Sequence, residues 1–173
     1  HVERNADVVA MTSYAPLFAR KNGTQWNPDL IYFNNTEVMP TVNYQVQKLC
    51  GNNSGTLYIR SKLQVEAVTT QNNQETTGYD EAAAKRISCS VVKDDASGDL
   101  ILKLVNITPL ATDTQIRIND FQGYQPVAQL SQLAGQPSDK DAVPTNSTIH
   151  VSPEFQYNMP AYSFSVIRIS RNK

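Results

Sequence analysis

The chain has 173 residues, with 15 Lys and Arg against 16 Asp and Glu, which gives a formal net charge of −1. This length suits one domain, or one domain with a fragment of a second, and is too short for a complete (β/α)₈ barrel of about 250 residues. The charges are interspersed and no apolar run reaches the length of a membrane span, so neither nucleic acid nor a membrane is an expected partner. Two His and two Cys at these spacings do not suit a four-ligand metal site, and no metal or cofactor is expected.

The composition favours strands over helices, because Thr, Val and Ile are abundant while Lys and Glu are sparse. A charged fraction of 18% and many small polar residues suit a secreted or periplasmic protein. In a eukaryotic secreted protein, the five Asn-x-Ser/Thr sequons would be surface acceptors; they begin at Asn22, Asn34, Asn52, Asn106 and Asn146. The chain starts at His1 without a targeting signal, so we expect a mature or truncated product. Cys50 and Cys89 are either buried free thiols or a disulfide, which spacing alone does not decide.

The first part of the chain reads as a helix, a strand end and a loop. Near-helical spacing of small apolar residues predicts a short helix over Glu3–Met11. The apolar run Thr12–Phe18 contains Pro16, which the end of a strand tolerates and a central strand does not. Arg20–Pro28 is a polar loop that carries Trp26, the only Trp of the chain.

A second helix is predicted after the compact apolar run Leu30–Phe33. Thr41 has the character of an N-cap, and apolar residues follow it at helical spacing, so we expect a helix over Val42–Cys50 with Gly51 as its C-terminal stop.

From Thr56 onward the pattern is short strands and turns, which predicts an antiparallel β-sandwich. In the clearest hairpin, two strand segments flank Asp94–Gly98, and the second is so apolar around Lys103 that it should be central and buried. Gln71–Gly78 reads as a polar loop. Ser165 and Arg168 are expected to face outward from the last strand. The predicted strands are Leu57–Ile59, Leu63–Ala67, Arg86–Lys93, Asp99–Val105, Thr114–Asn119, Val127–Leu130, Thr148–Val151 and Tyr162–Ile169.

Few residues suggest chemistry. His150 falls within a predicted strand, where a solvent-facing or hydrogen-bonded His is the expected state. Turn formation explains Asp94, Asp95, Asp139 and Asp141 better than calcium binding does, because they lack the regular spacing of an EF-hand loop. Glu3, Glu37, Glu66, Glu75, Glu81 and Glu154 lie in polar surroundings without a local glycosidase signature.

The best binding feature is Trp26 beside Asn27 and Asp29. A loop Trp with such neighbours can stack on a sugar face while they hydrogen-bond its hydroxyl groups, or it can fill a gap between two packed units.

Four blocks in the first 50 residues carry a resemblance: Glu3–Val9, Met11–Phe18, Trp26–Phe33 and Asn43–Lys48. In order and spacing they resemble the carboxy-terminal part of α-L-arabinofuranosidases of glycoside hydrolase family 51. Leu102–Asn106 and Pro160–Val166 resemble that family's terminal sandwich more loosely, so the resemblance covers nearly the whole chain.

The resemblance implies a mainly β chain: residues 1–52 as a short α/β remnant of the end of a (β/α)₈ barrel, then a jelly-roll-like antiparallel sandwich over residues 53–173. Glu3–Met11 then corresponds to the helix before the last barrel strand, Thr12–Leu17 to that strand, and Val42–Cys50 to the last barrel helix. Pro16 would lie at the carboxyl end of the strand, where barrels place their substrate loops.

The family's chemistry is retaining hydrolysis of terminal α-L-arabinofuranosyl residues in arabinoxylan and arabinan, which needs two Glu residues. No position here matches either glutamate, so we expect no catalytic residue and no activity of the isolated chain. The part of the substrate site that this chain could still supply is one wall, formed by Trp26, Asn27 and Asp29. The implied partners are the polysaccharide, through the full enzyme, and the missing barrel of the same enzyme.

An alternative is a non-catalytic carbohydrate-binding module. Its platform would come from the sandwich aromatics Tyr58, Tyr79, Phe121, Tyr124, Phe155 and Tyr157, of which Tyr124 and Tyr157 are expected to be exposed. Because one strand and one or two helices cannot close a barrel, the apolar faces of residues 1–52 would have to fold back, stay mobile or pair between chains as a homo-oligomer.

Overall fold

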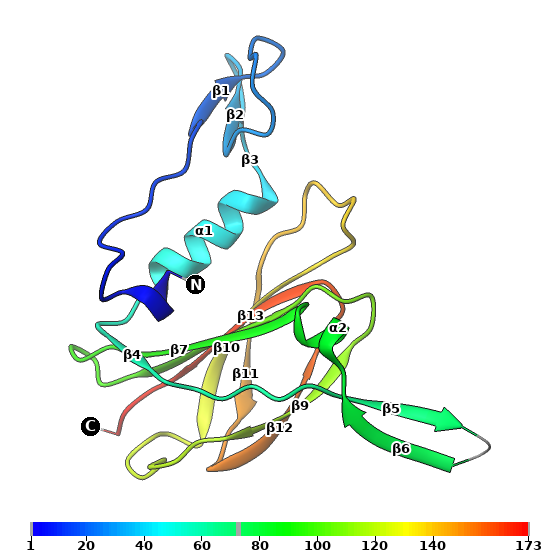
Figure 1. Ribbon diagram of the computed structural model, residues 1–173. Coiled ribbons are helices and arrows are strands. Elements are labelled where there is room, and N and C mark those ends of the chain that lie inside the picture. The colour runs from blue at the N-terminus through cyan, green and yellow to red at the C-terminus, as the bar shows by residue number, and fades with distance from the viewer. Residues whose placement is uncertain (1, 72–73, 173) are drawn as a thin grey trace.

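A computed structural model describes residues 2–71 and 74–172. It is mainly β, and its strand pairs are antiparallel apart from one parallel pair near the N-terminus. Figure 1 shows a small N-terminal sheet projecting from one end of helix α1, and a larger group of strands that forms the rest of the molecule. The expected sandwich is therefore present.

The N-terminal segment differs from its prediction. Only a 3₁₀ turn, η1 (Glu3–Asn5), forms where a helix over Glu3–Met11 was expected. Residues 9–17 belong to no helix or strand, and β1 (Phe18–Arg20) begins where the predicted strand ends. A short helix depends on packing and a strand on a hydrogen-bonded neighbour. Within the described chain, residues 10–15 have no such neighbour, whereas the Pro16 and Leu17 carbonyls accept from the N–H groups of Leu30 and Ile31.

A three-stranded sheet follows. β1 pairs in parallel with β2 (Ile31–Phe33), and β2 pairs antiparallel with β3 (Val38–Pro40). The apolar run Leu30–Phe33 therefore contains a strand, β2. The sequence analysis did not predict β3.

The predicted second helix is present as α1 (Val42–Asn52), and Thr41 is its N-cap. The Thr41 hydroxyl accepts a hydrogen bond from the Tyr44 N–H at 3.3 Å. Gly51 was predicted as the stop, and this is wrong, because the helix continues through it to Asn52. Asn53 instead covers the helix end, where its N–H donates to the Cys50 carbonyl and its side-chain amide donates to the Leu49 carbonyl at 2.9 Å.

Six strands form the main sheet in the order β11-β10-β13-β8-β7-β4. As predicted, β8 is central and buried, and Lys103 within it is only 5% exposed. The predicted hairpin joins β7 to β8: the Asp94 N–H donates to the Asp99 carbonyl at 3.0 Å, and Gly98 takes the left-handed conformation (φ 76°) that suits glycine. The strands are β4 (Leu57–Ile59), β7 (Ile87–Lys93), β8 (Leu100–Asn106), β10 (Val127–Ala134), β11 (Thr145–His150) and β13 (Ser163–Ile169).

A second layer covers one face of this sheet. It contains the pair β9 (Thr112–Arg117) and β12 (Glu154–Met159), and the helical turn α2 (Glu81–Ala84) also packs against this core. The hairpin β5 (Glu66–Gln71) and β6 (Gln74–Tyr79) projects to one side (Figure 1). The prediction of a loop over Gln71–Gly78 is wrong where β6 forms, and its residues 72–73 lie outside the described residues. The predicted strand Leu63–Ala67 survives only as the start of β5.

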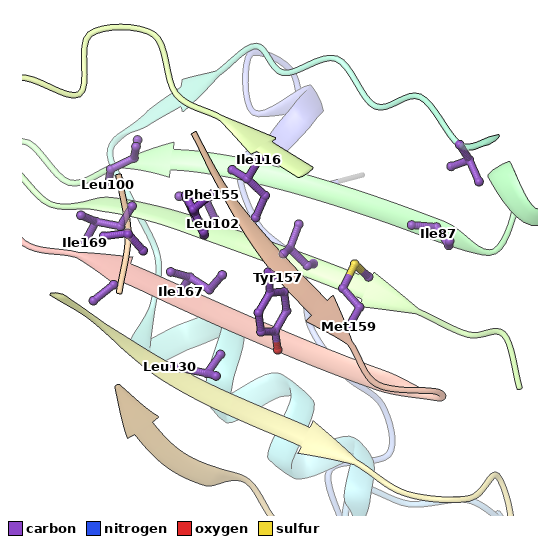
Figure 2. Packing of buried hydrophobic residues seen from close by; sticks show 14 residues of the cluster. Ile87, Leu100, Leu102, Ile116, Leu130, Phe155, Tyr157, Met159, Ile167 and Ile169 are labelled. Carbon is purple, nitrogen blue, oxygen red and sulfur yellow. The ribbon is translucent and has the colours of Figure 1, made fainter. Parts of the chain in front are cut away.

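The sequence analysis missed β12, although its apolar residues alternate strictly inward. Figure 2 shows Phe155, Tyr157 and Met159 pointing from β12 toward the main sheet, against the Leu and Ile side chains of β8 and β13. Ser165 was expected to face outward, but it is buried, because its hydroxyl accepts a hydrogen bond from the Tyr157 hydroxyl at 2.8 Å.

Helix α1 packs on the opposite face of the main sheet. Leu49 of α1 joins a second core cluster with Val92, Ile101 and Phe164. The main sheet therefore has an apolar layer on each face. Among the described residues, no helix is long and apolar enough to cross a membrane.

Candidate functional site

A groove of about 670 Å³ lies beside the loop between β1 and β2. Trp26 and Asn27 line it, together with the start of α1 and residues 139–141 of the loop between β10 and β11. Trp26 is 69% exposed, so its ring is available to a ligand and does not fill a gap within this chain.

Hydrogen bonds hold the loop in shape. The Tyr32 hydroxyl accepts from the Asp29 N–H and donates to Asn27 Oδ1, both at 2.9 Å. The peptide bonds Ala15–Pro16 and Asn27–Pro28 are cis. The oxygen of Asn27 is thus occupied within the loop, which leaves its NH₂ group to donate to a ligand.

Asp29 is 1% exposed and is not part of the groove wall. The Thr24 hydroxyl lies 3.3 Å from Asp29 Oδ2 and 3.0 Å from the Trp26 carbonyl oxygen. It has a single proton, so it can donate fully to only one of these two acceptors. Asp29 Oδ1 has no hydrogen-bond partner. Of the three residues predicted for this site, the structure brings Trp26 and Asn27 to the groove and places Asp29 in the interior of the loop.

Sequence reasoning missed other residues of this groove. Tyr32 was taken only as part of an apolar run, and Lys140 and Asp141 reach the groove from a loop more than a hundred residues later. Local sequence carries no signal for that juxtaposition, which depends on how α1 packs beside β10.

The remaining candidates have structural surroundings. His150 is exposed on β11. Asp94 caps the β7–β8 turn, and its hydrogen bond from the Ser97 hydroxyl at 2.8 Å is the main cause that lowers the pKa of its carboxyl group. Asp139 accepts from the Gln136 N–H at 2.7 Å, which is also a turn interaction. The described residues contain no group of three potential metal ligands.

Both cysteines are free thiols. Although Cys50 retains exposed surface, the atoms packed around its sulfur raise the pKa of its thiol by desolvation. Four of the six glutamates have polar partners within the chain: Glu3 with Lys103, Glu81 with Lys85, Glu154 with Arg117, and Glu37 with Asn34.

Among the sandwich aromatics whose side chains the structure describes, none is fully exposed, so they form no exposed row. Tyr157 was expected to be exposed, but it is buried in the core, as is Phe155. Tyr124 is half-buried between Phe121 and the guanidinium of Arg171. The Tyr79 side chain lies outside the described residues.

A strand–helix segment followed by a two-layer antiparallel sandwich, with an open loop groove beside the helix, is the architecture that the resemblance to the carboxy-terminal part of glycoside hydrolases predicts. Residues 1–163 match the family model described as the α-L-arabinofuranosidase C-terminal domain. The chain belongs to this family, which forms the C-terminal domain of α-L-arabinofuranosidases of glycoside hydrolase family 51.

Individual proteins that are similar to this chain are also α-L-arabinofuranosidases. The chain is 39% identical over 108 residues to an extracellular exo-α-L-arabinofuranosidase of Streptomyces chartreusis, covering 57% of this chain and 13% of that protein. It is 27% identical over 177 residues to α-L-arabinofuranosidase A of Aspergillus niger, covering 95% and 24%. The solved structure of an arabinose-bound MgGH51 α-L-arabinofuranosidase superposes with a TM-score of 0.83 at 29% identity, covering 99% of this chain and 26% of that one. The chain thus spans about a quarter or less of the length of these relatives.

Proposed function

We propose that this chain is the carboxy-terminal part of a secreted α-L-arabinofuranosidase, in which residues 1–52 complete a (β/α)₈ barrel and residues 53–173 form the companion sandwich. One observation carries the proposal: residues 10–15 belong to no helix or strand and form no backbone–backbone hydrogen bond with another segment of the described chain, and Met11 among them is 85% exposed. Backbone N–H and C=O groups of an extended apolar segment normally pair with neighbouring strands. A barrel supplies such neighbours on both sides.

The small N-terminal sheet supports the same proposal. β1 and β2 pair in parallel, and β1 lies at the edge of its sheet. Parallel strands are normally buried on both faces by other elements. Here Leu17 and Phe18 are exposed instead, as expected for an interior that the rest of a barrel would cover.

In the whole enzyme, the Trp26 groove would form a wall of the substrate site. The Trp26 ring would stack on an arabinofuranosyl or adjoining sugar face, and the Asn27 amide would donate to a hydroxyl group. Asp29 would hold the loop rather than touch the substrate. The two catalytic glutamates would come from the barrel portion, which would carry out the retaining hydrolysis.

The first experiment assays the 173-residue chain on p-nitrophenyl α-L-arabinofuranoside. We expect no turnover above background, and turnover that survives repurification would contradict the proposal that catalysis resides in another part of the enzyme. The second replaces the matching region of the Aspergillus niger enzyme with this chain. We expect the chimera to be active and the truncated enzyme without any such region to be inactive; a truncated enzyme with full activity would overturn the barrel-completing role.

The groove is tested in that chimera with Trp26→Ala. Loss of a stacked ring should lower kcat/KM by about tenfold or more, while the melting temperature stays within a few degrees. Val38→Ala, which truncates another exposed apolar side chain, is the matched control and should leave kcat/KM unchanged. Equal kinetics of the Trp26 variant and this control would remove Trp26 from the substrate site.

A further inference from the structure

A second hollow, of about 480 Å³, opens between the segment that follows β4 and strand β9. It lies over the face of β7 and β8 that is turned away from α1: Leu100, Leu102 and Leu104 face this side, whereas Ile101 faces the helix. The hollow and the N-terminal segment are therefore on opposite faces of the main sheet. A barrel completed by residues 1–52 would leave it open.

The floor of the hollow is apolar and its rim is cationic. The three leucines of β8 form the floor with Ile116 of β9. Five Lys and Arg side chains line it against a single carboxylate, that of Asp120. Two of the five have carboxylate partners of their own, Lys93 with Asp95 and Arg117 with Glu154. Arg60, Lys62 and Arg171 form no ion pair within the described chain, so this rim is locally positive on a chain of net charge −1.

Arg171 is held in one place before any ligand arrives. Its guanidinium lies over the Tyr124 ring, 4.9 Å from the ring centre. The loop below it contains Gly123 (φ 85°), where an added Cβ would come within 3.2 Å of the guanidinium carbon. The Arg171 N–H donates to Asp99 Oδ1 at 3.3 Å, and the Asn172 N–H donates to the Gly123 carbonyl at 2.8 Å. A cation fixed in this way loses little side-chain entropy on binding an anion.

We propose that this hollow binds a small amphipathic carboxylate, with its apolar body on the leucine floor and its carboxylate between Arg171 and the Arg60–Lys62 pair. An apolar cavity with a few convergent polar groups is the usual form of a small-molecule site, and the volume falls within the normal range of 300–1,000 Å³. The excess of cations selects an anion, and the planar guanidinium suits a carboxylate. The site is independent of the proposed arabinofuranosidase function.

The test uses 4-phenylbutanoate and its neutral counterpart 4-phenylbutan-1-ol as probes in calorimetric titrations of the 173-residue chain. We expect the acid to bind at least about tenfold more tightly than the alcohol, and the difference to shrink as salt is raised. Equal affinity for the two probes, or no binding of the acid at millimolar concentration, would overturn the proposal.

Variants locate the carboxylate. Arg60→Ala/Lys62→Ala and Arg171→Gln should each weaken acid binding by about tenfold without changing alcohol binding. Lys48→Ala/Lys85→Ala removes two exposed lysines that do not line the hollow, matches the charge change of the double variant, and should bind the acid within twofold of the unmodified chain. Equal losses in the two double variants would mean that only net charge matters, which contradicts a defined site.

The floor is tested without substitution, so that a folding defect cannot obscure the result. Leucine methyl resonances should shift on addition of 4-phenylbutanoate for Leu100, Leu102 and Leu104, and stay in place for Leu49 and Leu133 on the other face of the sheet. Shifts confined to Leu49 and Leu133 would place the ligand elsewhere and refute the proposed site.

Discussion

Glu3 and Lys103 form an ion pair that joins the first turn of the chain to its central strand. Lys103 lies on the α1 side of β8, where it is almost fully buried, and Glu3 also accepts a hydrogen bond from the Ser90 hydroxyl at 2.6 Å. The predicted division at residue 52 is therefore bridged by a charge pair. An unpaired ammonium in this position would be costly, so the N-terminal turn protects the sheet as much as the sheet anchors the turn.

Glu3→Gln should destabilise the chain, because it leaves the Lys103 ammonium without its counter-charge. We expect a loss of about 2–3 kcal/mol in the free energy of unfolding, measured by urea denaturation. The double variant Glu3→Gln/Lys103→Met removes both charges and should recover most of that loss. A double variant as unstable as Glu3→Gln would show that the pair is not the cause.

Asp29→Asn should stabilise the isolated chain or leave its stability unchanged, although it alters a buried residue. The carboxylate has one unpartnered oxygen and competes for the Thr24 proton, so removing its charge relieves a desolvation cost. Thermal unfolding at neutral pH measures the effect, with Asp139→Asn as a control that removes the charge of an exposed carboxylate and keeps an oxygen to accept from the Gln136 N–H. A fall of several degrees in the Asp29 variant would mean that the charge has a partner after all.

Because Asp94 caps the turn between β7 and β8, the stability of this hairpin should depend on pH. The Ser97 hydrogen bond lowers the pKa of Asp94 below its usual value, so its contribution is complete above about pH 4 and is lost as pH falls through the lowered pKa. Asp94→Asn should therefore be less stable than the unmodified chain at neutral pH, and the gap should narrow below pH 4. A gap that is constant from pH 7 to pH 2 would contradict this linkage.

Asn106→Ala should be among the most destabilising single changes in the sandwich. The side chain has no exposure, and its NH₂ group donates to the carbonyls of Leu110 and Pro160 at 2.9 Å while its oxygen accepts from the Thr108 N–H. Leaving these buried groups without partners should cost about 2–4 kcal/mol of unfolding free energy. Thr108→Val is the control: it removes the hydroxyl that donates to Asn106 Oδ1 but keeps the backbone N–H that also donates to it, so it should cost less stability. A cost below 1 kcal/mol for Asn106→Ala would show that the loop re-forms without it.

Burial also determines which Asn-x-Ser/Thr sequons can be glycosylated. Asn106 cannot accept a glycan in the folded chain, whereas Asn146 is exposed on β11, the edge strand of the main sheet. Secretion from a yeast host should give glycosylation at Asn146 and none at Asn106, as measured by mass spectrometry of peptides before and after deglycosylation. An occupied Asn106 would require a different fold of the β8–β9 connection.

Local signals predicted the sandwich well. The hairpin at Asp94–Gly98, the Thr41 cap and the buried central strand around Lys103 follow from turn chemistry, capping and apolar runs, which are local properties. β12 is the exception: Phe155, Tyr157 and Met159 alternate strictly with polar residues, which is a local signal of a half-buried strand, and the sequence analysis did not use it. Ser165 was misplaced because its burial depends on the Tyr157 hydroxyl, which the sequence does not position.

The candidate sites show the same limit. Trp26 and Asn27 were singled out because an aromatic beside an amide in a polar loop is a local pattern, and both line the groove, while their contact with a substrate stays a prediction. Asp29 was grouped with them by proximity in sequence, but the β1–β2 loop turns its carboxylate inward. The sequence did not show that Arg171 and Arg60 line the same hollow, because this depends on the end of the chain lying near the segment that follows β4.

The strand order of the main sheet also has a consequence for biosynthesis. β8 and β13 form its middle, yet β9 to β12 are translated between them, and β10 can join β8 only through β13. A nascent chain that has emerged as far as β12 holds two separate fragments, β4-β7-β8 and β10-β11, each with an open strand edge. The sheet therefore cannot be completed until β13 is available, and before that each fragment has an open edge that another chain could pair with.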